Sequence, residues 1–173
     1  KDAVQSLHIA SAHDLNAKMT TVIREPDAKL KQGLTTLESG EDWLLKPRMV
    51  DGNPNLWTPG IKLGVTQGSF FHQTECFGPV LGLMRARDLD HAITLANDID
   101  YGLTGGIHTL DDREIAIWRD RVQVGNAYIN RGTTGAIVQR QPFGGWKKSA
   151  FGNNFFSSHI TFSTASETWY KES

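Results

Sequence analysis

The stretch Gly125–Gly152 reads GNAYINRGTTGAIVQRQPFGGWKKSAFG, and the interpretation of the chain starts from it. It opens with Ala127-Tyr128-Ile129, an aromatic and β-branched run that predicts a short strand. The glycines of Arg131–Ala136 predict an open turn, in which backbone N–H groups can approach a ligand closely. In Gln141–Gly145, a proline of fixed φ and two glycines hold one aromatic side chain, Phe143. A strand, an amide-rich loop and a pinned aromatic residue together favour a site for a small carboxylate-bearing ligand.

Upstream of this stretch, the pattern predicts alternating strands and helices. Strands are expected at Pro79–Arg85, Gly102–Thr109 and Gly125–Ile129. One helix is expected between the first two strands, capped by Asp88 and ending at Asn97. A second helix is expected to start at Asp111 or Asp112 and to bury Ile115, Trp118 and Val122. Three strands separated by two helices, with short connections, indicate an α/β fold with parallel, right-handed βαβ units.

The two ends of the chain give looser patterns. We expect helices within Lys1–Ala10 and Asp27–Leu37, strands at Glu41–Arg48 and Ile61–Val65, a loop at Asp51–Gly60 anchored by Trp57, and a strand at His159–Ser163. We divide the chain into a domain, residues 1–152, and a polar C-terminal tail, residues 153–173, expected to act as a packing or oligomerisation strand.

Composition sets limits on the function. The 173 residues with 39% hydrophobic content suit one globular domain, and a net charge of −1 provides no basic field for nucleic acid. No apolar run is long enough for a membrane-spanning helix. One cysteine cannot form an internal disulfide, so we expect a cytoplasmic protein. The chain starts at Lys1, without a methionine and inside a predicted helix, and is expected to be a piece of a longer protein.

Two motifs resemble signatures of the aldehyde dehydrogenase superfamily. Glu75–Val80 reads ECFGPV and is similar to the Glu-x-Phe-Gly-Pro block of that family, and Gly125–Asn130 with Pro142–Ser149 resembles its C-terminal signature. The insert Thr134–Val138 resembles the pyrroline-5-carboxylate dehydrogenases, including those fused to proline dehydrogenase in proline-utilisation A proteins. The resemblance covers residues 56–152 closely and implies that residues 1–152 are part of a Rossmann-like catalytic domain.

The resemblance also implies roles for individual residues. It implies NAD as the cofactor, with Glu75 accepting hydrogen bonds from the nicotinamide-ribose hydroxyls and Phe77 packing beside the nicotinamide ring. It implies that the backbone N–H groups of Gly135 and Ala136 hold the α-carboxylate of the aldehyde substrate, while Phe143 lines its aliphatic chain. The simpler interpretation of the same residues is a solvated carboxylate, a surface turn and two aromatic side chains that close a core.

Cys76 is not predicted to be a nucleophile. The neighbouring carboxylate of Glu75 would raise the pKa of the thiol, and no helix N-terminus or lysine stands next to it in the sequence. In the family this position is variable, and the nucleophilic cysteine belongs to an upstream motif that is absent here. We therefore expect no catalytic residue and no activity in this chain alone, and the histidine spacing predicts no metal site.

The resemblance implies a reaction for the complete protein. A cysteine thiolate adds to glutamate γ-semialdehyde, NAD⁺ takes a hydride, and water hydrolyses the resulting thioester to give glutamate in proline catabolism. A homo-oligomer and a fused proline dehydrogenase domain are expected as well. Two alternatives stay open: a catalytically inactive module retained for assembly, and a dehydrogenase for another aldehyde.

Overall fold

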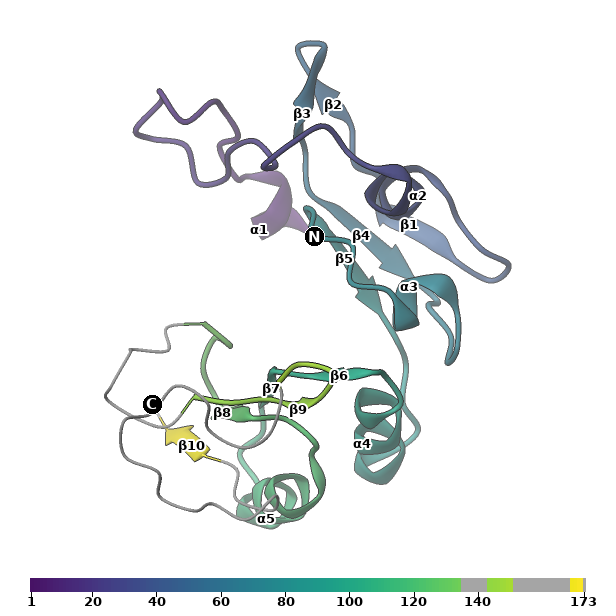
Figure 1. Cartoon of the computed structure of the whole chain (residues 1–173), viewed down its shortest axis with the longest axis vertical. Coiled ribbons are helices and arrows are strands. Elements are labelled where there is room, and N and C mark those ends of the chain that lie inside the picture. Colours follow the sequence, from purple (N-terminus) through teal and green to yellow (C-terminus); the bar gives the residue numbers. More distant parts are fainter. Residues whose placement is uncertain (135–142, 151–168, 173) are drawn as a thin grey trace. The chain divides into compact units, whose positions relative to one another are not determined.

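The computed structural model describes residues 1–134, 143–150 and 169–172 and contains two compact units, Lys1–Arg85 and Ala86–Ser173 (Figure 1). The first unit contains α1 (Asp2–Gln5), α2 (Ala28–Thr35), β1 (Asp42–Leu45), β2 (Met49–Val50), β3 (Asn53–Trp57), β4 (Gly60–Leu63), α3 (Phe70–Gln73) and β5 (Val80–Leu83). The second contains α4 (Leu89–Asn97), β6 (Tyr101–Gly102), β7 (Thr104–Ile107), α5 (Asp112–Arg121), β8 (Asn126–Ile129), β9 (Trp146–Lys147) and β10 (Trp169–Glu172). Within the described residues, no helix has the length and apolar character needed to cross a bilayer.

The first unit is built on a three-stranded sheet in the order β1-β4-β5. β4 and β5 are parallel, whereas β1 runs antiparallel to β4. Helix α2 begins at its cap, where the Asp27 side chain accepts a hydrogen bond from Leu30 N at 2.9 Å. Leu30 and Leu34 of this helix form a buried cluster with Cys76, against which Phe71 of α3 packs. The helix predicted at Asp27–Leu37 is confirmed.

One prediction for the first unit is wrong, and a second is confirmed only in part. The segment predicted as a loop, Asp51–Gly60, contains strand β3, which pairs antiparallel with β2. Asp51 and Gly52 have φ values of 51° and 69°, so they form the kind of tight turn that joins two antiparallel strands. The helix expected within Lys1–Ala10 is present but short, since α1 covers only Asp2–Gln5 and its cap makes no side-chain hydrogen bond.

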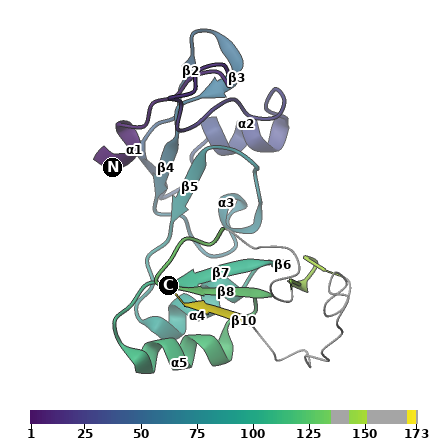
Figure 2. The same ribbon diagram turned by 90° about the vertical axis from the view of Figure 1, so that its left-hand side faces the viewer.

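The second unit contains the predicted βαβ arrangement. β7 and β8 are parallel neighbours joined through α5, and β10 pairs parallel with the other edge of β8. Figure 2 shows α4 and α5 on one face of this sheet. The core between them consists of Ile93, Trp118, Val122, Val124, Ala127 and Ile129. Asp88 and Asp111 cap the two helices, as predicted.

The α/β class is confirmed. The three strands that were predicted to form one parallel sheet, however, do not all belong to the same sheet. β5 pairs with β4, and β7 pairs with β8, so β5 and β7 belong to different sheets. The reason is that hydrophobic spacing identifies strands without identifying their partners. The strand predicted at His159–Ser163 lies outside the described residues, and the division into residues 1–152 and a tail stays a prediction.

Candidate functional site

Glu75 and Phe77 lie together in the turn between α3 and β5. Phe77 has a φ of 53°, in the left-handed region that bulky residues rarely adopt. The residue is 78% exposed. A backbone held in this region costs about 1–3 kcal/mol, and an exposed ring adds little to the core in return. A strained, outward-facing aromatic residue of this kind is a candidate for a ligand contact.

A cavity of about 280 Å³ lies beside Phe77. Its walls combine apolar side chains, including Val22 and Leu30, with charged residues of both signs: Arg24, Glu25, Asp27 and Lys29. This volume is near the lower limit of about 300 Å³ for small-molecule pockets. The cavity is therefore large enough for a small molecule or for one part of a larger ligand.

The Glu75 side chain is exposed, two residues before Phe77 and outside the wall of the cavity. Among the described residues, none forms a hydrogen bond or ion pair with its carboxylate. Both oxygens can therefore accept hydrogen bonds from hydroxyl groups, which is what a ribose would offer.

The Cys76 side chain turns inward and is 9% exposed. Burial is the main cause that raises the pKa of its thiol, with a smaller opposing effect from Lys29 and Lys62. Glu75 is not among the causes, so the expected reason for a raised pKa is wrong although the direction is the one expected. A thiol in this state is a poor nucleophile, and the absence of a catalytic role for Cys76 stays a prediction.

Phe143 belongs to the second unit and is half-buried. The residue after Phe143, Gly144, is held by Asn126 of β8. The Nδ2 atom of Asn126 donates to Gly144 O and to Leu103 O, each at 3.0 Å. Asn126 itself is 1% exposed. At Gly125 a Cβ atom would lie 1.9 Å from Gly144 O, so glycine is required there. The sequence motif contained Asn126, but only as a family position. A buried amide within an apolar strand was the signal for this role.

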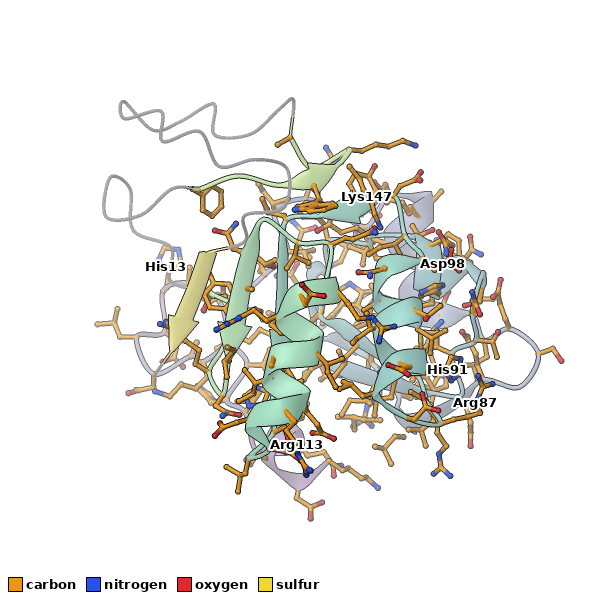
Figure 3. The ribbon with its side chains drawn as sticks, turned by 90° about the horizontal axis from the view of Figure 1, so that it is seen from below. His13, Arg87, His91, Asp98, Arg113 and Lys147 are labelled. Atoms are coloured by element: carbon orange, nitrogen blue, oxygen red, sulfur yellow. The ribbon has the colours of Figure 1, made fainter. Side chains whose placement is uncertain are left out.

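Two further contacts hold the segment that follows Phe143. The Lys147 ammonium donates to Asn97 O and, at 2.9 Å, to Ile99 O, so it lies at the end of α4 next to Asp98 (Figure 3). Ser149 Oγ accepts a hydrogen bond from Gly102 N at 2.9 Å. Lys147 thus stabilises the fold through internal carbonyl groups.

The structure brings only some of the predicted site residues together. Glu75 and Phe77 share one turn in the first unit, and Phe143 lies in the second. Gly135 and Ala136 lie outside the described residues. Just before them, the Arg131 guanidinium lies 5.5 Å from the centroid of the Tyr128 ring, which is a cation–π distance.

Sequence comparison supports one family. A model described as the aldehyde dehydrogenase family matches residues 1–168. The chain is 34% identical over 171 residues to 1-pyrroline-5-carboxylate dehydrogenase of Bacillus subtilis (strain 168), which covers 95% of this chain and 33% of that protein. It is 42% identical over 115 residues to the Bacillus cereus (strain B4264) protein of the same name, covering 64% of this chain and 22% of that protein. The chain thus spans about a third or less of these relatives.

Solved structures give the same result. Proline utilization A (PutA) from Corynebacterium freiburgense is 55% identical, with a TM-score of 0.85 over 87% of this chain and 16% of that chain. 1-Pyrroline-5-carboxylate dehydrogenase from Thermus with bound NAD is 31% identical, with a TM-score of 0.74, and the match covers 84% of this chain and 28% of that chain. NADP-dependent glyceraldehyde-3-phosphate dehydrogenase from Bacillus halodurans C-125, complexed with NADP, is 34% identical, with a TM-score of 0.75. This match covers 88% of this chain and 32% of that chain. From the motifs, the strained Phe77 turn and these similarities, we conclude that the chain belongs to the aldehyde dehydrogenase family.

Proposed function

We propose that the complete protein containing this chain is an NAD-dependent dehydrogenase that oxidises L-glutamate γ-semialdehyde to glutamate in proline catabolism. The conformation of Phe77 is the structural observation that carries the proposal, because a ligand packed on the ring would account for a strained and exposed aromatic residue beside a cavity. The similarity to pyrroline-5-carboxylate dehydrogenases and to PutA supports the choice of substrate.

On the cofactor side, Phe77 packs against the nicotinamide ring and the Glu75 carboxylate accepts hydrogen bonds from the ribose hydroxyls. When bound, NAD⁺ supplies the acceptor for a hydride. The contribution of this chain is orientation, since hydride transfer depends on a ring held at the correct distance and angle. The Thermus neighbour with bound NAD supports NAD, and the neighbour with NADP makes a comparison of both cofactors part of the test.

On the substrate side, the backbone N–H groups of Gly135 and Ala136 hold the α-carboxylate and Phe143 contacts the aliphatic chain. Support comes from the Thr134–Val138 insert and from the Asn126 contact that fixes the backbone beside Phe143. We place the nucleophilic cysteine outside this chain, because the one cysteine in it is buried. A fused proline dehydrogenase domain is part of the proposal and is supported by the similarity to PutA. A homo-oligomer and a cytoplasmic location stay predictions.

The proposal is tested by following NADH formation in the complete protein, with NAD⁺ or NADP⁺ and with either L-glutamate γ-semialdehyde or propanal. We expect a preference in kcat/KM of about 100-fold or more for the semialdehyde, because of the two aldehydes only that one carries a carboxylate that can pair with the backbone N–H groups of Gly135 and Ala136. A preference for propanal, or for another aldehyde without an α-carboxylate, would contradict the proposal. No turnover in a folded protein would favour the inactive assembly module.

The anchor is tested separately with Gly135→Pro, which removes one backbone donor and restricts φ. The KM for the semialdehyde should rise by about tenfold or more, while the KM for propanal stays within about twofold. Equal losses for the two aldehydes would show that the loop does not hold the carboxylate.

A further inference from the structure

We propose that Gly33 of α2 and Cys76 form a size-matched seat that positions Phe77, so that Cys76 is a positioning residue for the nicotinamide ring. The inference rests on the proposed function, because it takes Phe77 as the residue that packs against that ring. It assigns the buried thiol a role through its volume rather than through its nucleophilicity.

A side chain at Gly33 would crowd Cys76, so that either the thiol or the turn that carries it must shift. A Cβ atom at Gly33 would lie 2.9 Å from Cys76 Sγ and 3.5 Å from both Cys76 Cβ and Phe71 Cε2. Real Cβ atoms essentially never approach a neighbour within 3.0 Å. Glycine in the interior of a helix is unfavourable compared with alanine. The thiol occupies the missing volume, which gives a physical reason for glycine at this position.

The residue on the other side of Phe77 is held by the same helix. A Cβ atom at Gly78 would lie 2.1 Å from Leu30 Cδ1. Leu30 and Gly33 are three residues apart, so they lie on one face of α2. This face therefore receives both Cys76 and Gly78, while the ring between them points outward. Contacts on both sides explain how the backbone of Phe77 is kept at its φ of 53°.

The surroundings of the thiol are densely packed. Cys76 belongs to the same buried cluster as Leu30 and Leu34, with Phe71 packed against it. Its Sγ also donates to Thr74 O, at 3.7 Å, within its own turn. Burial raises the pKa of the thiol, in agreement with a packing role. Because close-packed interiors transmit changes in volume, an added methyl group at the seat should displace the turn and not be absorbed locally.

A displaced turn has a specific kinetic consequence. Phe77 lines the cavity that we assign to the nicotinamide end of the cofactor. A misplacement of about 1 Å at such a contact can cost about 100-fold in rate. The seat should therefore affect the KM for NAD⁺ and the rate of hydride transfer, while the KM for the aldehyde changes little.

The test is a double-mutant cycle in the complete protein, with Gly33→Ala, Cys76→Ala and the combined variant. Gly33→Ala should raise the KM for NAD⁺ by about tenfold or more, with the KM for the semialdehyde within about twofold. Removing Sγ makes room for the new methyl group, so the combined variant should recover to within about threefold of Cys76→Ala. Gln32→Ala, an exposed neighbour on α2, is the matched control and should leave both KM values unchanged.

Melting curves separate this effect from unfolding, because alanine is a better helix former than glycine. Impaired NAD⁺ kinetics at an unchanged or higher melting temperature support the seat. If Gly33→Ala does not fold, recovery of folding in the combined variant supports the proposed fit between Gly33 and Cys76. A combined variant that also fails to fold overturns this proposal. Unchanged NAD⁺ kinetics in Gly33→Ala, or a combined variant as impaired as Gly33→Ala, also overturn it.

Phe77→Ala distinguishes failure of the seat from failure of the proposed function. If Phe77→Ala impairs NAD⁺ kinetics but Gly33→Ala does not, the seat is wrong and the cofactor assignment stands. If Phe77→Ala has no effect on NAD⁺ kinetics, the cofactor assignment is wrong and the seat loses its function with it.

Discussion

Lys62 and Glu41 form an ion pair inside the first unit, with 3.3 Å between Nζ and Oε2 and with side chains 2% and 1% exposed. Lys62 Nζ also donates to Thr36 O at 2.6 Å and lies 4.6 Å from the centroid of the Phe71 ring. The pair therefore joins β4 to the end of α2 and to α3. These two helices support the turn that carries Phe77.

Lys62→Met should destabilise the chain strongly, because it leaves the Glu41 carboxylate buried without its cation. The expected loss is about 3–5 kcal/mol in the free energy of unfolding, measured by urea denaturation. The combined variant Lys62→Met/Glu41→Gln removes both charges and should recover a large part of this loss. A single variant that loses less than about 1 kcal/mol would contradict a buried pair.

Asn126→Ala should reduce stability by about 1–3 kcal/mol, because Gly144 O loses its donor in a partly buried position. Asn126→Asp keeps the shape but replaces the donating amide with an acceptor, so it should be at least as destabilising. Urea denaturation of both variants provides the measurement. Wild-type stability in Asn126→Asp would show that the hydrogen bond to Gly144 does not hold the segment beside Phe143.

The sequence was sufficient for those elements whose signals are local. Asp27, Asp88 and Asp111 mark helix starts because a carboxylate cap acts within three residues, and the helices begin where these residues stand. Strand pairing depends on distant residues. For this reason, the alternation of predicted strands and helices along the chain could not show that β5 and β7 belong to different sheets.

Much of the candidate site was equally invisible in the sequence. The motif identified Phe77 as a family position, but its left-handed backbone and the Gly33 contact behind it depend on segments far apart in the chain. The same holds for Lys62, which composition alone would assign to a solvated surface, although it is buried beside two aromatic rings. Packing across long separations in sequence explains both cases.

Cys76 should react slowly with thiol reagents, because the thiolate is the reactive form and burial raises the pKa of the thiol. The chain has one cysteine, so a reagent such as 5,5′-dithiobis(2-nitrobenzoate) reports on it alone. At about pH 8, the native chain should react at least about tenfold more slowly than the urea-unfolded chain. The chain should also show no turnover with NAD⁺ and the semialdehyde. Turnover that disappears in Cys76→Ala would reverse the assignment of Cys76.

Asp27 should make the stability of the chain depend on pH in the acid range. The hydrogen bond from Leu30 N is the main cause that lowers the pKa of Asp27 below its usual 3.8. The resulting stability is fully present above 3.8 and is lost as the pH falls through the lower folded-state pKa. Asp27→Asn keeps an acceptor that does not titrate. Between about pH 5 and pH 2, its melting temperature should therefore fall by less than that of the wild type. An identical decrease in the two proteins would contradict this role for the cap.

The most direct test of the central claim is the rate of hydride transfer in Glu75→Gln, measured in the complete protein as the first turnover of NADH formation. Loss of a charged acceptor for the ribose hydroxyls should lower this rate by about tenfold or more. The KM for L-glutamate γ-semialdehyde should stay within about twofold, because Glu75 is assigned to the cofactor and not to the aldehyde. A hydride-transfer rate equal to that of the wild type would contradict the account.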